Sequence, residues 1–232
     1  MNIQKKRIII IGGAYGSGKS EISLNLAQRL ATQGFRSVVV DLDFVNPYFR
    51  SRDWQGRLGE MVEVVSSHQG YEGADLPAIS AKILAELRLG QRPLIIDLGG
   101  DPIGAKVLGS FACEPALTRA HFWLVLNPYR PFTEEPPAMV EMVRKLESAA
   151  GLKADGLIAN PNLLEETKPE EVEQGLNKVQ ETAAALQLPI KFVTVESQLY
   201  AALKPRLEPS GVELLPLKRY LFPPWEQTIE GN

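Results

Sequence analysis

Cysteine and histidine are scarce in this sequence of 232 residues, which contains one cysteine, Cys113, and two histidines, His68 and His121. A single cysteine cannot form a disulfide within the chain, and it cannot supply the paired thiolates of a CxxC zinc or iron–sulfur site. The two histidines are far apart and have no cysteine beside them, so neither is expected to bind a metal. The composition therefore favours a reducing compartment, and we expect a cytoplasmic protein.

Long apolar runs and long runs of one charge are also missing. The longest apolar stretch near the start covers residues 8–11, far short of the ~20 residues that cross a bilayer. Basic residues number 25 and acidic residues 28, a net charge of −3, so neither nucleic acid nor a membrane is an expected partner. We predict one domain over residues 1–232, with a core large enough to need no disulfide or structural metal.

Short apolar runs alternate with helical patterns along the chain. The runs expected to form buried strands cover residues 7–11, 37–42, 93–98, 121–126, 156–159 and 190–195. Strands that are apolar on both faces and alternate with helices are typical of a parallel sheet covered on both sides. The predicted fold class is therefore three-layer α/β/α, with a mostly parallel central sheet. The Pro-rich segments 127–137 and 205–224 are expected to be loops, because proline cannot donate to a ladder or continue a helix.

The first strand is followed by a complete match to the phosphate-binding pattern GxxxxGK[ST], which consists of Gly13, Ala14, Tyr15, Gly16, Ser17, Gly18, Lys19 and Ser20. Glycines let the backbone turn its N–H groups around a phosphate, and the helix expected over residues 21–32 adds a favourable dipole. Lys19 is expected to bind the outer phosphates and act in catalysis, and Ser20 to ligate Mg²⁺. Glu21, the next residue, is expected at the nucleotide too.

The strand over residues 93–98 brings Asp97 to its carboxyl end, which is the edge where open α/β sheets bind ligands. We predict that Asp97 belongs to the Mg²⁺ shell and that Gly100 lets the backbone approach the γ-phosphate. Asp101 either senses that phosphate or caps a helix that begins at Pro102.

The strand over residues 37–42 also ends in carboxylates, Asp41 and Asp43, which lie on the same side of an extended strand. Both are predicted Mg²⁺ ligands, and Asp43, further toward the ligand edge, is also predicted to orient the attacking water. Arg50 and Arg52 follow, and each either binds a phosphate or is solvated and paired with neighbours such as Asp53.

Two later loops leave the same edge of the predicted sheet. Asn160 follows the strand over residues 156–159, where its amide can pair with a purine base, although a turn at Asn-Pro explains it equally well. Arg130 follows the strand over residues 121–126, and it is a candidate to contact a base, a phosphate or a partner.

These blocks together resemble the ParA/MinD/CobQ-CobB family of P-loop NTPases, in the SIMIBI class, from residue 7 to about residue 195. The resemblance is carried by the phosphate loop, by Asp41-Leu42-Asp43, by Asp97-Leu98-Gly99-Gly100 and by Asn160. It implies binding of Mg²⁺ and ATP, with GTP less expected, and slow hydrolysis. The loops after Asp43 and Asp97 would then act as a conformational switch for a protein partner or a second copy of the chain.

The chain also departs from this family. Ala14 stands where many relatives have a second lysine that reaches across a dimer, so hydrolysis driven by that lysine is not expected. The segment 220–226 contains two prolines and differs from the amphipathic MinD membrane helix. The alternative is a small-molecule kinase or an ATP-dependent ligase of the CobQ or dethiobiotin-synthetase type that acts on a carboxylate substrate. A third hypothesis is a module that binds nucleotide without hydrolysing it.

Overall fold

The central sheet is built from the apolar runs of the sequence. In the computed structural model, which describes residues 8–42, 58–66, 81–100, 102–109 and 114–222, eight strands pair in parallel in the order β3-β2-β4-β1-β5-β6-β7-β8. They are β1 (Ile8–Gly13), β2 (Ser37–Leu42), β3 (Val62–Ser66), β4 (Leu94–Leu98), β5 (His121–Leu126), β6 (Gly156–Ala159), β7 (Ile190–Glu196) and β8 (Leu214–Leu217). Every predicted strand is confirmed.

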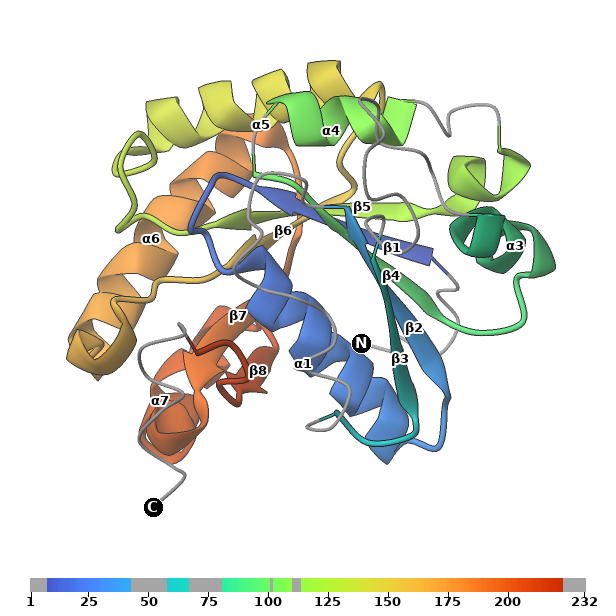
Figure 1. Cartoon of the computed structure of the whole chain (residues 1–232). Coiled ribbons are helices and arrows are strands. Elements are labelled where there is room, and N and C mark those ends of the chain that lie inside the picture. Colours follow the sequence, from blue (N-terminus) through green and yellow to red (C-terminus); the bar gives the residue numbers. More distant parts are fainter. Residues whose placement is uncertain (1–7, 43–57, 67–80, 101, 110–113, 223–232) are drawn as a thin grey trace.

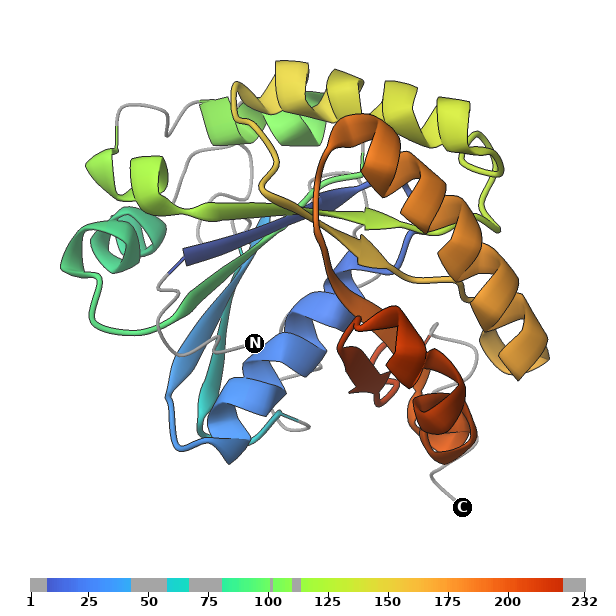
Figure 2. The same cartoon turned by 180° about the vertical axis from the view of Figure 1, so that it is seen from behind.

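Helices cover both faces of this sheet. They are α1 (Lys19–Thr32), α3 (Ala81–Leu89), α4 (Pro102–Gly109), α5 (Pro136–Ala150), α6 (Pro169–Leu186) and α7 (Tyr200–Leu207). Figure 1 shows α4 and α5 along one side of the strands and α1 on the other, and Figure 2 shows α6 and α7 from behind. The predicted three-layer α/β/α fold is confirmed.

Alternating side chains of the strands feed two separate cores. In β1, Ile10 packs into the core that includes residues of α3 to α7, whereas Ile9 and Ile11 pack with α1. All three are at most 1% exposed, as expected for a strand buried on both faces. Helical spacing produces the matching apolar stripes, such as Ile22, Leu26 and Leu30 on α1.

The prediction of loops in the Pro-rich segments is partly wrong. Residues 205–224 are not a loop throughout, because Pro205 lies inside α7 and Pro216 lies in β8. β8 pairs only with β7, at the edge of the sheet, and there a proline is tolerated because one side of the strand has no ladder. α5 begins at Pro136, where the missing N–H is not needed by the first turn of a helix.

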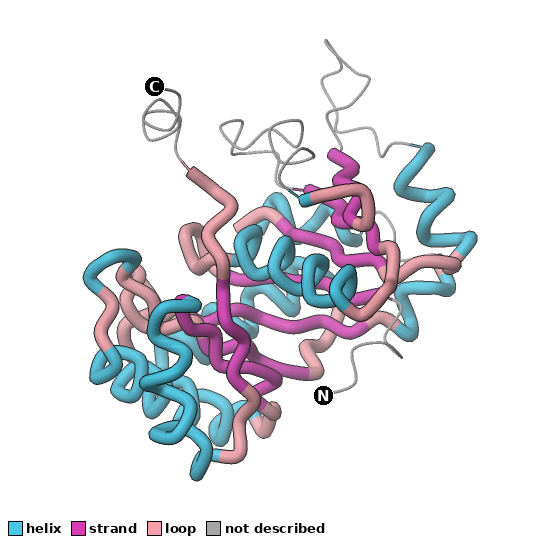
Figure 3. The backbone as a smooth tube through the Cα atoms, turned by 90° about the horizontal axis from the view of Figure 1, so that it is seen from below, coloured by secondary structure: helices cyan, strands magenta, loops and turns pink. Residues whose placement is uncertain are grey.

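The chain reverses its direction of travel across the sheet at β1. It leaves β1 through α1 toward β2, on the β4 side, and it later passes from β4 to β5, on the opposite side of β1. Such a reversal opens a crevice at the carboxyl ends of the central strands, where open parallel sheets bind ligands. Figure 3 shows the strands running through the molecule with helices on either side.

Candidate functional site

The phosphate-binding loop lies between the end of β1 and the start of α1. Gly16 has φ 70° and Gly18 has φ 95°, values in the left-handed region that favours glycine. Gly18 is the N-cap of α1 and supplies no side-chain cap to the helix. The loop therefore turns tightly into a helix N-terminus, a geometry that binds anions.

Lys19 is held across this loop. Its side chain is 5% exposed, and Nζ donates a hydrogen bond to the carbonyl of Ala14 at 3.1 Å. The loop after β4 approaches the same place, because a Cβ at Gly100 would lie 2.9 Å from Lys19 Nζ and 2.8 Å from the backbone of Tyr15. Only a glycine leaves room for this contact, so the loop after β4 and the phosphate loop touch directly.

Asn160, at the end of β6, fixes the other side of the phosphate loop. Its Nδ2 donates to the carbonyl of Ser17 at 2.7 Å, and its Oδ1 accepts a hydrogen bond from Thr194 Oγ1 at 2.6 Å. The contact is so close that a Cβ at Gly18 would lie 2.3 Å from Asn160 Nδ2. Asn160 therefore positions the loop as well as lining the site, and base reading by this amide stays a prediction.

Two of the predicted Mg²⁺ ligands are neighbours in the sheet. Asp41 of β2 is in register with Asp97 of β4, and Asp97 is in register with Ile11 of β1. Parallel strands lie roughly 4.8 Å apart, so these carboxylates share the sheet face on which Ile11 and α1 lie. Asp97 is 3% exposed.

These oxygen donors fit Mg²⁺, which typically binds one or two carboxylates together with phosphates and water. Ser20 lines the site and adds a hydroxyl. Within the described ranges no group of three His, Cys, Asp or Glu residues gathers. When bound, Mg²⁺ would neutralise phosphate charge. Asp43, the remaining predicted ligand and water-orienting residue, lies outside the described residues, as do Arg50, Arg52, His68, Asp101 and Cys113.

A cavity of about 720 Å³ lies between the phosphate loop and the loop at Asn160, and Asp41, Asp97 and Gly100 are not among the residues that line it. Its phosphate end contains Tyr15, Gly16, Gly18, Lys19 and Ser20, and its other wall contains Asn160 and Asn162 together with residues 196–198, 217–219 and 221. Cavities of roughly 300–1,000 Å³ are usual for small-molecule ligands. The site therefore brings most of the predicted nucleotide-contacting residues into one cavity.

The sequence predicts a loop at residues 217–221 and does not indicate that residues 217–219 and 221 form a wall of the cavity. Glu21 lines the cavity, but its carboxylate faces this segment: Oε1 accepts the N–H of Tyr220 at 2.7 Å and Oε2 that of Leu221 at 3.1 Å. Asn25, one turn further along α1, donates to the carbonyl of Lys218 at 2.9 Å and accepts its N–H at 2.9 Å. Removal of the Glu21 carboxylate from water raises its pKa to about 7, although both backbone N–H groups act in the opposite direction.

The other predicted residues are placed as follows. Arg130 Nε donates to the carbonyl of Gly16 at 2.9 Å, so this arginine lies beside the phosphate loop. His121 Nδ1 forms a hydrogen bond with the carboxylate of Asp155, which gives that ring a structural contact on β5.

In the part of the chain that the structure describes, no helix is long and apolar enough to cross a membrane.

The CobQ/CobB/MinD/ParA nucleotide binding domain family matches residues 8–198. The chain belongs to this family. It is a P-loop nucleotide-binding domain. The match covers the phosphate loop, the paired aspartates and the cavity lining, apart from the wall at residues 217–221. No curated protein matches the sequence.

Solved structures share the fold at low sequence identity. The cell division protein FtsY from Thermotoga maritima is 21% identical, with a TM-score of 0.56 over 81% of this chain and 61% of FtsY. FtsY from Elizabethkingia anophelis in complex with GDP is 19% identical, with a TM-score of 0.54 over 82% of this chain and 58% of that one. A nucleotide-binding protein from Archaeoglobus fulgidus in complex with ADP is 20% identical, with a TM-score of 0.50 over 89% of both chains. This chain thus spans about three fifths of the FtsY chains, and the likeness shows the fold alone.

Proposed function

We propose that the protein binds Mg²⁺·ATP, hydrolyses it slowly and acts as a conformational switch for a protein partner. The observation that carries this proposal is the direct contact between the loop after β4, at Gly100, and the phosphate loop at Tyr15 and Lys19. A phosphate that engages Lys19 meets the loop after β4 at the same point. Gain or loss of the γ-phosphate would therefore move that loop, which is how nucleotide switches work.

The chemistry we propose is displacement at the γ-phosphorus. Water forms the new bond to phosphorus, the bond to the β,γ-bridging oxygen breaks, and ADP and phosphate leave with the proton of the attacking water released to solvent. Lys19 neutralises charge on the phosphates, and Asp43 is the residue we propose to orient the water. Positioning and charge neutralisation account for most of the catalysis in reactions of this kind.

We propose ATP as the nucleotide because the family resemblance of the sequence motifs implies it. The solved structures that share the fold include one with ADP bound and one with GDP bound. Asn160 and Asn162 are the amides at the cavity that we propose to face the base. An amide both donates and accepts, which suits either purine, so the preference requires measurement.

The test is phosphate release from purified protein with Mg²⁺·ATP and, separately, Mg²⁺·GTP, with binding of each nucleotide followed in parallel. Lys19→Ala should abolish tight binding and release. Lys145→Ala removes an exposed lysine on α5 that pairs with Glu141, and it should behave as the wild type. Binding that is equal in Lys19→Ala and wild type would overturn the site assignment.

The same assay separates the alternative functions. Slow hydrolysis by the protein alone supports the switch. Nucleotide binding without phosphate release, followed by turnover when small carboxylates are added, would instead identify a kinase or ligase. Binding with no release under any of these conditions would leave a non-hydrolysing module.

A further inference from the structure

Arg130 lies in the loop between β5 and α5 and contacts the phosphate loop. In the sheet, β5 flanks β1 on the side opposite β4, and the loop after β4 also meets the phosphate loop. The Nε of Arg130 donates to the carbonyl of Gly16 at 2.9 Å. Arg130 and Gly16 both line the 720 Å³ cavity at its phosphate end. Lys19 donates a similar hydrogen bond to the carbonyl of Ala14, so two cationic side chains bind two carbonyls of the same short loop.

The loop that carries Arg130 is held by buried polar contacts on both sides. Asn127, 1% exposed, accepts the N–H of Tyr129 at 3.0 Å and donates to the carbonyl of Asn162 at 3.0 Å. Thr133, 2% exposed, donates to the carbonyl of Asn127 at 2.8 Å. These hydrogen bonds fix the backbone on both sides of Arg130. Because the loop is already ordered, less entropy is lost when Arg130 binds a ligand.

The guanidinium of Arg130 has donors left over for a ligand. Within the described ranges, its Nε has a partner, and neither Nη forms a hydrogen bond or an ion pair. Two further cations on the cavity wall have other contacts. Lys218 Nζ lies 5.7 Å from the ring centroid of Tyr220. Arg219 pairs through Nη1 with Glu165 at 3.9 Å, donates through Nε to the carbonyl of Leu221 and lies 4.8 Å from the ring centroid of Phe222.

We propose that Arg130 binds the γ-phosphate of the bound nucleoside triphosphate through its two Nη groups, as a second cation beside Lys19 from the same chain. A guanidinium held through Nε presents two parallel N–H donors, the geometry that suits phosphate oxygens. Mg²⁺ and Lys19 together neutralise only part of the triphosphate charge, and Arg130 adds a further positive charge without a second subunit. This inference rests on the proposed function, which supplies the ligand.

The first test compares affinities for ADP and for a non-hydrolysable ATP analogue in wild type, Arg130→Ala and Arg130→Lys. We expect Arg130→Ala to bind the analogue about 10- to 100-fold more weakly, as befits a lost hydrogen bond to a charged group, and to change ADP affinity much less. Arg130→Lys should recover part of the loss. Arg144→Ala, an exposed arginine of α5, is the matched control and should bind as the wild type.

A merely structural brace gives a different pattern. If Arg130→Ala weakens ADP and the analogue equally and lowers the thermal midpoint, the arginine only supports the phosphate loop and the proposal is wrong. Unchanged affinity for both nucleotides is equally decisive against it. Wild-type protein that shows no binding dependent on Lys19 overturns the proposed function as a whole, whereas loss of the Arg130 effect alone overturns only this inference.

The second test measures phosphate release per subunit as the protein concentration is varied. If the cation comes from the same chain, the rate per subunit stays constant with concentration, and Arg130→Ala lowers it by about 100-fold or more. A rate per subunit that rises with concentration, in wild type and Arg130→Ala alike, would show that a second copy supplies the charge.

Discussion

Single side chains of this site perform two tasks at once, because they face the ligand cavity and also hold the backbone around it. Asn160 lines the cavity while it supports Ser17 of the phosphate loop, and Glu21 lines it while it binds the backbone of Tyr220 and Leu221. A carboxylate in such a place loses water and keeps only the partners that the fold provides. The consequences should be measurable residue by residue.

Glu21 should make stability depend on pH. Its pKa in the folded protein is about 7, above the ordinary value of 4.5. Between these two values the folded state holds a proton that the unfolded chain has lost, so the free energy of unfolding falls as pH rises through this window and levels off above it. The effect is on the order of 3 kcal/mol at most. We expect it in nucleotide-free protein with a metal chelator present.

Glu21→Gln removes the titrating group and supplies the comparison. The free energy of unfolding should be measured by denaturant at about pH 5 and about pH 8. Between these values it should fall more in the wild type than in Glu21→Gln. Equal losses in the two proteins would mean that Glu21 titrates at its ordinary value and that residues 217–221 do not shield its carboxylate from water.

Thr194→Val should loosen the phosphate loop without touching the cavity. Thr194, 1% exposed on β7, donates to Asn160 Oδ1 and lies 3.2 Å from the carbonyl of Ala159. Valine keeps the shape but leaves a buried amide oxygen without its donor, at a cost of about 1–3 kcal/mol. We expect a lower thermal midpoint and weaker nucleotide binding, whereas Thr194→Ser, which keeps the hydroxyl, should retain the affinity. An affinity unchanged in Thr194→Val would contradict the chain of support from Thr194 through Asn160 to the phosphate loop.

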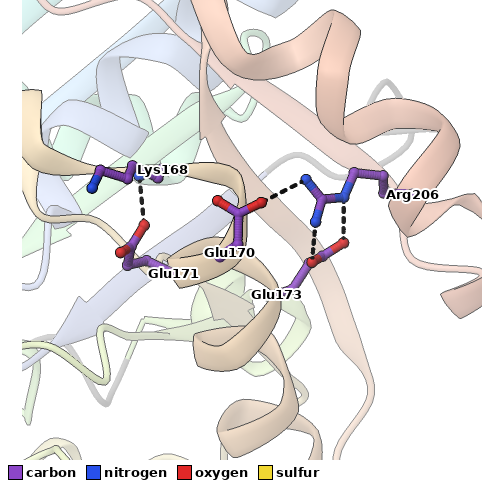
Figure 4. A network of polar contacts seen from close by, with 5 residues as sticks. All are labelled: Lys168, Glu170, Glu171, Glu173 and Arg206. Atoms are coloured by element: carbon purple, nitrogen blue, oxygen red, sulfur yellow. Dashed lines mark hydrogen bonds and ion pairs between the residues drawn. The ribbon is translucent and has the colours of Figure 1, made fainter.

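At the scale of elements, α6 and α7 are joined by an ion-pair network on the surface (Figure 4). Arg206 of α7 donates to both carboxylate oxygens of Glu173, at 2.8 and 2.7 Å, and to Glu170 at 3.1 Å. The carboxylate of Glu171 accepts the N–H of Lys168 at 2.9 Å and so caps the first turn of α6. The cap and the network act on the same end of α6.

Arg206→Ala should destabilise the protein only slightly, because exposed ion pairs are weakened by water and by the entropy of fixing long side chains. The difference in thermal midpoint from the wild type should be small in low salt and should vanish at about 1 M NaCl, where charges are screened within roughly 3 Å. Arg144→Ala, which lacks such a network in the described part of the chain, should show no salt-dependent difference. A salt-independent loss in Arg206→Ala would instead point to packing of its aliphatic stem.

For the whole molecule, the sequence predicts the central strands and the phosphate loop because their signals are local. Each of these strands contains a short apolar run, and the loop is one unbroken motif. β3 was missed because Glu63 interrupts a short edge strand, and β8 because it contains Pro216. The cavity wall of residues 217–221 was missed for another reason, since Asn25 and Lys218 pair across 193 positions, and no local pattern encodes such a contact.

Nucleotide should stabilise the molecule as a whole, because the loop is held by elements from both halves of the chain: β1 and β4 on one side, and β6 and β7 through Asn160 and Thr194 on the other. A ligand that binds only the folded state adds about 2.7 kcal/mol at 100 times its Kd, which corresponds to roughly 5–10 °C in thermal midpoint for a domain of this size. The wild type and Lys145→Ala should show this rise with Mg²⁺·ATP, and Lys19→Ala should not. An equal rise in Lys19→Ala would mean that the nucleotide stabilises the protein from somewhere other than the phosphate loop.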